Sequence, residues 1–168
     1  KKNLNLNNYE KVEAKKLAIS DTDGKKDFYI SEMSNLNSFH IEKKDLSKYK
    51  KISVESSTLE SVLKEKQIDL IRMDIEGHEV SIFKSLVDYI EKYNVKPSIL
   101  YEPHISKYNK DNNMFDQLEK LFKLGYSLEV AATSSKEANQ KFNLKNYKSI
   151  KSFNTDEKIR DIYLNISN

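Results

Sequence analysis

Hydrophobic residues occur along this chain in short blocks, and their spacing changes from one block to the next. Residues 68–75, IDLIRMDI, form a near-continuous apolar run, which is typical of a strand covered on both faces. Residues 78–94 have instead the spacing of an amphipathic helix. The apolar stripe of this helix consists of Val80, Phe83, Val87 and Ile90, with Ile82 and Leu86 beside it. Together the two blocks predict a buried strand followed directly by a helix.

The same kind of pattern extends over most of the chain. Further strands are predicted at 12–20, 25–31, 51–56, 96–104, 126–134 and 161–167. Further helices are predicted at 57–66 and 114–125, and residues 1–8 are predicted to be the last turns of another helix. A turn is predicted at 21–24, and polar irregular segments are predicted at 32–50 and 133–160. Ser57 and Glu60 have the spacing of a capping box at the start of the first of these helices. Gly125 suits a left-handed cap at the end of the second.

Strands that alternate with helices predict βαβ units, and therefore an α/β fold with a mostly parallel sheet. The last two predicted strands have a polar loop and no clear helix between them, so this pair is free to be antiparallel. A chain of 168 residues is long enough for one hydrophobic core, and we expect a single domain over residues 1–168.

Composition narrows the possible partners and the expected location. The formal net charge is +3, but Lys is mixed with Asp and Glu nearly everywhere, whereas a nucleic-acid binder gathers its Lys and Arg into a patch. The chain has no Cys, which excludes disulfides, thiolate metal sites and a Cys nucleophile. No apolar run approaches the ~20 residues of a membrane helix, and the first residues lack the apolar centre of a signal peptide. We therefore expect no nucleic-acid partner, no membrane span and a cytoplasmic location.

Acidic residues gather where the predicted strand 68–75 ends. Glu76 follows Asp74 in a turn, and Gly77 lets the backbone turn sharply into the next helix. Glu79 comes at the start of that helix, where the helix dipole favours an acid, and we interpret it as no more than that. Asp74 precedes the helix at a buried strand end, where an unpaired carboxylate is costly. We therefore predict that Asp74 ends a central strand, faces a crevice and has a functional role.

A second predicted strand ends in the same way, because SILYEPH closes with Glu102 and His104. Ligands of open α/β sheets bind in the crevice beyond the carboxyl ends of the strands. If the two strands are neighbours, Asp74, Glu76, Glu102 and His104 converge there. Asp74, Glu76 and His104 are each candidates for a general base. The four side chains are also acceptable ligands of a hard divalent cation, so a metal-dependent hydrolase is an alternative function.

The segment IDLIRMDIEGHE, followed by an amphipathic helix and ILYEPH, resembles the signature of the FkbM-type S-adenosylmethionine-dependent methyltransferases. LAISDTDGKKDFYIS and TLESVL before this signature, and LGYSLEV and DIYLNIS after it, fall in the order of that family. The resemblance covers nearly the whole chain.

The resemblance implies a Rossmann-like class I methyltransferase sheet, mostly parallel with a final antiparallel strand pair. It implies S-adenosylmethionine as the cofactor and methyl transfer, usually to a hydroxyl oxygen, with a sugar, a lipid or a secondary metabolite as acceptor. The implied catalytic residues are Asp74, Glu76, Glu102 and His104. The implied cofactor-binding residues are Ala18, Ile19, Ser20 and Asp74, and Asn37 and Ser38 lie in a segment near the site.

The chain departs from the family pattern in its glycines. A complete domain of this kind has a glycine-rich turn close to the cofactor, whereas the three glycines here, Gly24, Gly77 and Gly125, are far apart. We therefore expect the N-terminal strands of the sheet to be missing, which would leave the strand before Asp74 as an exposed apolar edge that favours a homodimer or aggregation. Residues 1–168 alone are then expected to bind the cofactor weakly or not at all. A non-catalytic remnant that serves as a binding module is the remaining alternative.

Overall fold

The computed structural model describes residues 6–7, 9, 11–33, 36–41, 43–133 and 159–166. For residues 43–44, 130–133 and 159–166 it describes the backbone alone. The predicted polar segment at 133–160 and the predicted helix end at 1–8 lie almost entirely outside these residues.

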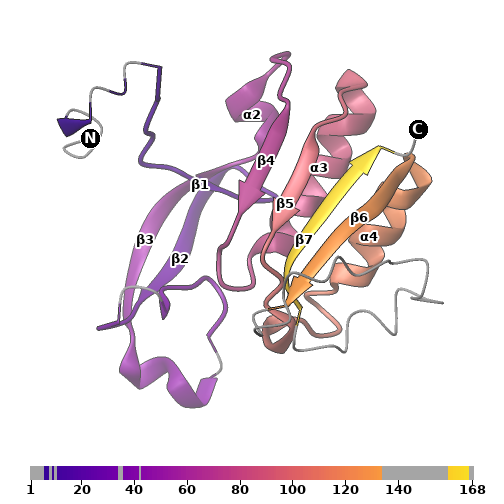
Figure 1. Ribbon diagram of the computed structural model, residues 1–168. Coiled ribbons are helices and arrows are strands. Elements are labelled where there is room, and N and C mark those ends of the chain that lie inside the picture. The colour runs from indigo at the N-terminus through magenta and orange to yellow at the C-terminus, as the bar shows by residue number, and fades with distance from the viewer. Residues whose placement is uncertain are drawn as a thin grey trace.

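The described strands form two sheets (Figure 1). The larger sheet has the order β4-β5-β7-β6, in which the strands are Leu70–Met73 (β4), Ser98–Tyr101 (β5), Ile159–Ile166 (β7) and Tyr126–Thr133 (β6). The smaller sheet has the order β1-β3-β2, in which the strands are Ala18–Ile19 (β1), Lys50–Ser57 (β3) and Gly24–Ile30 (β2).

Strand direction in the larger sheet follows from its pairings. β4 runs parallel to β5, and β7 is antiparallel to both of its neighbours, β5 and β6. β4, β5 and β6 therefore run in one direction and β7 runs against them. This confirms the predicted antiparallel pair at the end of the chain. The prediction of a mostly parallel sheet holds for the direction of these strands and not for their pairings, because inserting β7 makes two of the three pairings antiparallel.

Two helices cover one face of the larger sheet (Figure 1), and they are Glu79–Tyr93 (α3) and Met114–Lys123 (α4). A short helix, Leu59–Leu63 (α2), precedes β4, and two 3₁₀ turns span Lys43–Lys48 (η2) and Ile105–Lys107 (η3). α4 ends before Gly125, whose φ of 92° is the left-handed conformation predicted for its cap. Within the described part of the chain, no helix is long and apolar enough to cross a membrane.

The core lies between α3, α4 and the larger sheet. Every residue of the predicted α3 stripe is buried. Phe83 of α3 packs its ring against Tyr101 of β5, with the ring centroids 5.0 Å apart and the planes at 70°. This edge-to-face contact is a favourable geometry for two aromatic rings. The helical period of the sequence therefore predicted correctly which face of α3 turns toward the sheet.

The position of β4 corrects a prediction. β4 is the outer strand of its sheet among the described strands, and Leu70 is 55% exposed. A central strand with both faces covered had been predicted from the apolar run at 68–75.

The first predicted strand is much shorter than expected. Only Ala18–Ile19 of the predicted range 12–20 is a strand, and it pairs with the end of β3, Ala18 opposite Ser56. Residues 11–16 are exposed, and Val12 keeps 51% of its surface accessible. The segment lacks a partner among the described strands, so its apolar alternation does not produce a longer strand.

The start of α2 also differs from its prediction. The N-cap is Thr58, whose hydroxyl accepts from the backbone N–H of Ser61 at 3.1 Å. The hydroxyl of Ser57 donates instead to Asp23 at 2.6 Å. The predicted capping box of Ser57 and Glu60 is therefore wrong, because the Ser57 hydroxyl that this box requires is hydrogen-bonded to Asp23, in the turn between β1 and β2.

The turn between β4 and α3 depends on a glycine. Glu76 and Gly77 both have positive φ, 54° and 95°. A Cβ placed on Gly77 would lie 2.4 Å from the Cβ of Lys107 in η3. Only glycine therefore permits both the backbone conformation of this turn and its close contact with the segment that follows β5.

We expect Gly77→Ala to lower the free energy of unfolding more than Gly125→Ala does. Gly125 has nearly the same φ, 92°, but a Cβ there would meet nothing within 4 Å. The left-handed conformation costs an L-residue about 1–2 kcal/mol at either position, and the contact with Lys107 adds to that cost only at Gly77. Urea unfolding of the two variants measures the difference, and equal losses would show that the turn yields to the added carbon.

Candidate functional site

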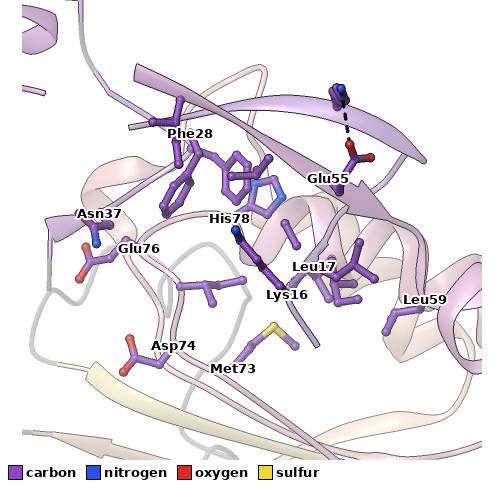
Figure 2. Close-up of a pocket in the computed structure, with 18 of the residues that line it drawn as sticks. Lys16, Leu17, Phe28, Asn37, Glu55, Leu59, Met73, Asp74, Glu76 and His78 are labelled. Atoms are coloured by element: carbon purple, nitrogen blue, oxygen red, sulfur yellow. Dashed lines mark ion pairs between the residues drawn. The ribbon is translucent and has the colours of Figure 1, made fainter. Parts of the chain in front are cut away.

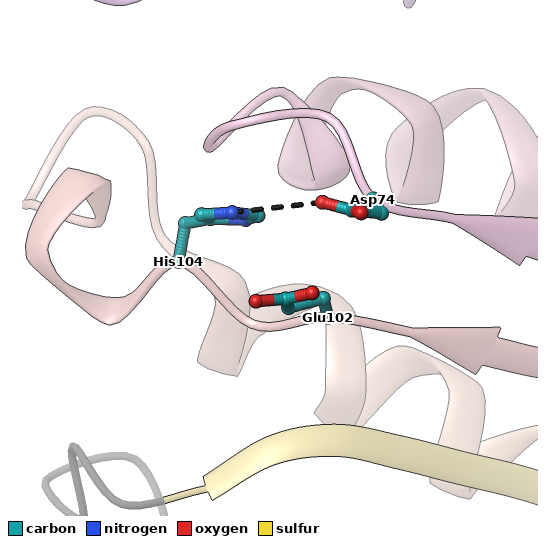
Figure 3. Close-up of side chains that lie close together, drawn as sticks. All are labelled: Asp74, Glu102 and His104. Atoms are coloured by element: carbon teal, nitrogen blue, oxygen red, sulfur yellow. Dashed lines mark ion pairs between the residues drawn. The ribbon is translucent and has the colours of Figure 1, made fainter. Parts of the chain in front are cut away.

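Three of the predicted site residues meet where β4 and β5 end side by side (Figure 3). The strands stay paired to their ends, since the backbone N–H of Glu102 donates to the carbonyl of Met73 at 3.0 Å. Each of Asp74, Glu102 and His104 has one side-chain oxygen or nitrogen atom in this cluster, and these three atoms lie within 4.8 Å of one another. The convergence predicted from two strand ends is confirmed.

His104 is the centre of this cluster. Its Nδ1 is 2.9 Å from Oε1 of Glu79. Its Nε2 lies on the opposite side of the ring, 3.6 Å from Oε1 of Glu76 and 3.8 Å from Oδ1 of Asp74. The ring thus connects a buried carboxylate to two carboxylates that are partly open to solvent, Asp74 and Glu76, whose side chains are 36% and 28% exposed.

The charges around His104 change its pKa. Burial by itself lowers the pKa of the imidazole, because it disfavours the charged form. The hydrogen bond and negative charge of Glu79, followed by the charges of Glu76 and Glu102, act in the opposite direction and outweigh it. The pKa of His104 is therefore raised from its ordinary value of 6.5. His104, which lies where β4 and β5 end, is therefore a stronger base than an ordinary histidine.

Glu79 corrects the interpretation that it only complements a helix dipole. Its side chain is fully buried at the start of α3. One of its carboxylate oxygens accepts from the backbone N–H groups of Ile75 and Gly77, both at 3.3 Å, and contacts His104. The other accepts from the hydroxyl of Tyr108 at 3.2 Å. This contact set was not visible in the sequence because Tyr108 and His104 belong to a different segment.

A cavity of about 1130 Å³ lies beside the cluster, between the two sheets (Figure 2). Phe28 of β2 and Met73 of β4 lie across it from each other. Asp74 and Glu76 line it at the end of β4, so Asp74 belongs both to the cavity and to the cluster around His104.

The predicted cofactor residues divide into two groups. Ala18 and Ile19 line the cavity, as does Asn37. Ser20 is fully buried and is not among the lining residues. Its hydroxyl is 3.1 Å from Nε2 of His78 and donates to Asp21 at 3.1 Å. Ser20 thus holds the wall of the cavity together, and its hydroxyl is already engaged.

Ser38, predicted to lie near the site, also has a structural contact. Its hydroxyl donates to the backbone carbonyl of Glu76 at 2.9 Å. The bond fixes the peptide of a residue whose φ is positive, and it joins the loop after β2 to the turn after β4. The orientation of Glu76 therefore depends on a segment 38 residues away.

His78 and His40 were not predicted from the sequence. They form a hydrogen-bonded pair, of which His78 lines the cavity. Nδ1 of His78 is 3.2 Å from Nε2 of His40, and the ring of Phe39 stacks on His78 with centroids 4.2 Å apart. Because Ser20 donates its proton to Asp21, it accepts from Nε2 of His78, and Nδ1 of His78 accepts from His40. Their only sequence signals were the position of His78 directly after Gly77 and that of His40 close to Asn37 and Ser38.

The burial of His78 disfavours its charged form. Its side chain is 3% exposed. Burial, followed by the charges of His40 and Lys26, lowers the pKa of His78 from 6.5 to about 4. His78 is therefore neutral at neutral pH, as its role as both donor and acceptor requires.

Residues 1–128 match the family model of the Methyltransferase FkbM domain. The chain belongs to the FkbM methyltransferase family. The match includes β4, β5, both walls of the cavity and every residue predicted for the site. No curated protein and no solved structure matches the chain. Membership in the FkbM family favours methyl transfer over the metal-dependent hydrolysis that the same side chains had left open.

The pKa of His78 predicts how stability depends on pH. Between about pH 6.5 and pH 4 the unfolded chain binds a proton at His78 that the folded chain does not, so the free energy of unfolding falls as the pH falls through this range. The full difference corresponds to about 3 kcal/mol. Groups that act on His78 are His40, Lys26, Asp21 and Glu79.

The raised pKa of His104 acts in the opposite sense, because its stabilisation is complete below pH 6.5 and is lost as the pH rises through its folded pKa.

We therefore expect His78→Gln to flatten the dependence of stability on pH in acid. Urea unfolding at several pH values between 4 and 7 gives the dependence of the free energy of unfolding on pH for the parent protein and for His78→Gln. Subtracting one dependence from the other cancels the contribution of the carboxylates that titrate in both proteins. Parallel slopes in the two proteins would contradict a neutral buried His78.

Proposed function

We propose that the protein is an S-adenosylmethionine-dependent methyltransferase that methylates a hydroxyl oxygen of a small molecule, a glycan or a lipid. The observation that carries this proposal is the place of Asp74, which lines the cavity and also faces the base His104. A cofactor in the cavity and an acceptor at the cluster would thus meet at one side chain.

The cavity fits the proposed cofactor in size and in chemistry. Ligand pockets of this kind measure about 300–1,000 Å³, so the available space is sufficient. The aromatic and aliphatic lining, which includes Phe28, Phe39 and Leu59, suits an adenine ring. Asp74 and Glu76 suit the hydroxyl groups of a ribose or the positive charges of the amino and sulfonium groups. We infer that Ala18, Ile19 and Asp74 are the predicted residues that contact the cofactor.

When bound, S-adenosylmethionine supplies an electrophilic methyl group carried by a positively charged sulfur. The residues of this chain have three tasks around it. The cavity walls exclude water and position the donor, which is the main requirement of such a transfer. Asp74 orients the groups between the cavity and the cluster. His104 accepts the proton that the acceptor hydroxyl loses, at Nε2.

The arrangement of the larger sheet supports the finer proposal of a Rossmann-like fold. β4, β5 and β6 run in one direction, β7 is reversed, and α3 and α4 return over one face (Figure 1). The proposed site lies beyond the carboxyl ends of β4 and β5, where ligands bind in open sheets of this class.

The charge of the cluster also bears on the acceptor. Asp74, Glu76 and Glu102 place three carboxylates near the ring of His104. A phosphate or carboxylate on the acceptor would meet like charges there, which is an effective means of rejecting the wrong ligand. We infer that the part of the acceptor next to the reacting hydroxyl is neutral or positively charged.

The proposal predicts that Asp74→Asn weakens binding of S-adenosylmethionine by about tenfold or more, which corresponds to about 1.4 kcal/mol. Asp69→Asn is the matched control. Asp69 is an exposed carboxylate just before β4, at the opposite end of the strand, so this variant makes the same change in charge without touching the cavity.

Saturation-transfer NMR with S-adenosylmethionine and S-adenosylhomocysteine suits this comparison, because it detects weak binding as well as tight binding. Signal in the parent protein and in Asp69→Asn, with loss in Asp74→Asn, is the expected result. Equal signals in all three proteins would remove Asp74 from the cofactor site. Binding of a divalent cation without any signal from either nucleoside would favour the hydrolase.

A further inference from the structure

Glu79 makes more contacts than a helix-start acid requires. It is fully buried, and its two carboxylate oxygens have four hydrogen-bond partners: the backbone N–H groups of Ile75 and Gly77, Nδ1 of His104 and the hydroxyl of Tyr108. Burial of an ionised carboxylate is costly unless hydrogen bonds replace the water it loses. Four partners from three segments supply that replacement.

This contact set determines which nitrogen of His104 carries a proton. The oxygen of Glu79 that faces Nδ1 already accepts from two backbone N–H groups, so it acts as an acceptor. Nδ1 must then be the donor, and the neutral imidazole keeps its lone pair on Nε2. Nε2 is the nitrogen that lies within 4 Å of Asp74 and Glu76.

We propose that Glu79 is the positioning residue of the site: it holds His104 as the Nδ1–H tautomer and turns the basic Nε2 toward the place of the acceptor hydroxyl. This inference rests on the proposed function for the identity of the acceptor group. Glu79 touches neither cofactor nor acceptor, because its side chain is fully buried, and it acts through the ring of His104.

The proton transfer that this arrangement serves is balanced as follows. The O–H bond of the acceptor breaks, and its electron pair stays on the oxygen. That oxygen would bond to the methyl carbon as the carbon–sulfur bond of S-adenosylmethionine breaks, and S-adenosylhomocysteine would leave with the electron pair of the broken bond. The proton bonds to the lone pair of Nε2. His104 then carries a positive charge that Glu79, Asp74 and Glu76 stabilise, and it returns the proton to solvent after the acceptor leaves.

A purely structural role for Glu79 is the competing explanation. The same carboxylate fixes the turn between β4 and α3 through two N–H groups, and Tyr108 through its hydroxyl. Loss of stability in a Glu79 variant is therefore expected under both explanations. The protonation of His104 separates them, since a structural role requires no particular tautomer.

The chain has three histidines, which makes this measurement direct. Protein labelled with ¹⁵N and ¹³C in histidine gives three sets of ring signals, which His40→Gln and His78→Gln assign by elimination. Long-range ¹H–¹⁵N spectra distinguish the two neutral tautomers. We expect His104 to be the Nδ1–H tautomer and to titrate above the ordinary histidine value of 6.5, in the direction of its raised pKa. An Nε2–H tautomer in the parent protein overturns the proposal without the use of any Glu79 variant.

Two variants complete the experiment. Glu79→Gln keeps the size of the side chain and removes its charge, and it is expected to shift the His104 titration to lower pH. Tyr108→Phe is the matched control. It removes one partner of Glu79 and the acceptor of the His104 backbone N–H, and it leaves the carboxylate against Nδ1 in place. The His104 titration should remain raised in Tyr108→Phe even if the protein loses stability. Equal titration of His104 in the parent protein and in folded Glu79→Gln refutes the positioning role.

These measurements need no cofactor, so their outcome is independent of the methyltransferase proposal. A raised Nδ1–H His104 in a protein that shows no signal with S-adenosylmethionine would support Glu79 as the positioning residue and reject the proposed reaction. Binding of the cofactor together with an Nε2–H His104 would support the methyltransferase proposal and reject Glu79 as the positioning residue.

Discussion

A fully buried carboxylate places a strict demand on the segments that surround it, and Glu79 imposes that demand on three of them. Its oxygens are satisfied by the turn after β4, by His104 after β5 and by Tyr108 after η3. If any of these segments moved away, the carboxylate would lose hydrogen bonds in a place that water does not reach. The ends of β4 and β5 are therefore held together by the cost of leaving one charge unsatisfied, in addition to the pairing of the strands.

A second set of contacts joins the two sheets. The bonds from Ser20 to His78 and from His78 to His40 connect the end of β1 and the loop after β2 to the start of α3. Ser38 adds a bond to the backbone of Glu76. His78 lines the cavity, which lies between two sheets that no described strand pairing connects.

The two histidine environments are opposite in character, although both histidines lie close to Glu79. Burial, followed by the charges of His40 and Lys26, outweighs the negative charges of Asp21 and Glu79 at His78, so its pKa falls to about 4 and it serves as a neutral hydrogen-bonding bridge. His104 is surrounded by carboxylates, so its pKa rises despite its burial. Environments that separate the pKa values of like groups are typical of sites that perform acid–base chemistry. The histidine next to the acidic cluster is the one suited to accept a proton.

The sequence by itself determined the order of the elements, the buried face of α3 and the meeting of Asp74 with Glu102 and His104. These features follow from local periodicity and from the rule that parallel strands end at one edge of a sheet. The burial of Glu79 and the bridge from His78 to Ser20 were decided only by the tertiary structure. Each of them depends on which distant segments come into contact, 58 residues apart for His78 and Ser20. A helix-start acid and a strand-end serine look the same in a sequence whether their partner is water or a histidine from another segment, because the difference lies in the packing around them.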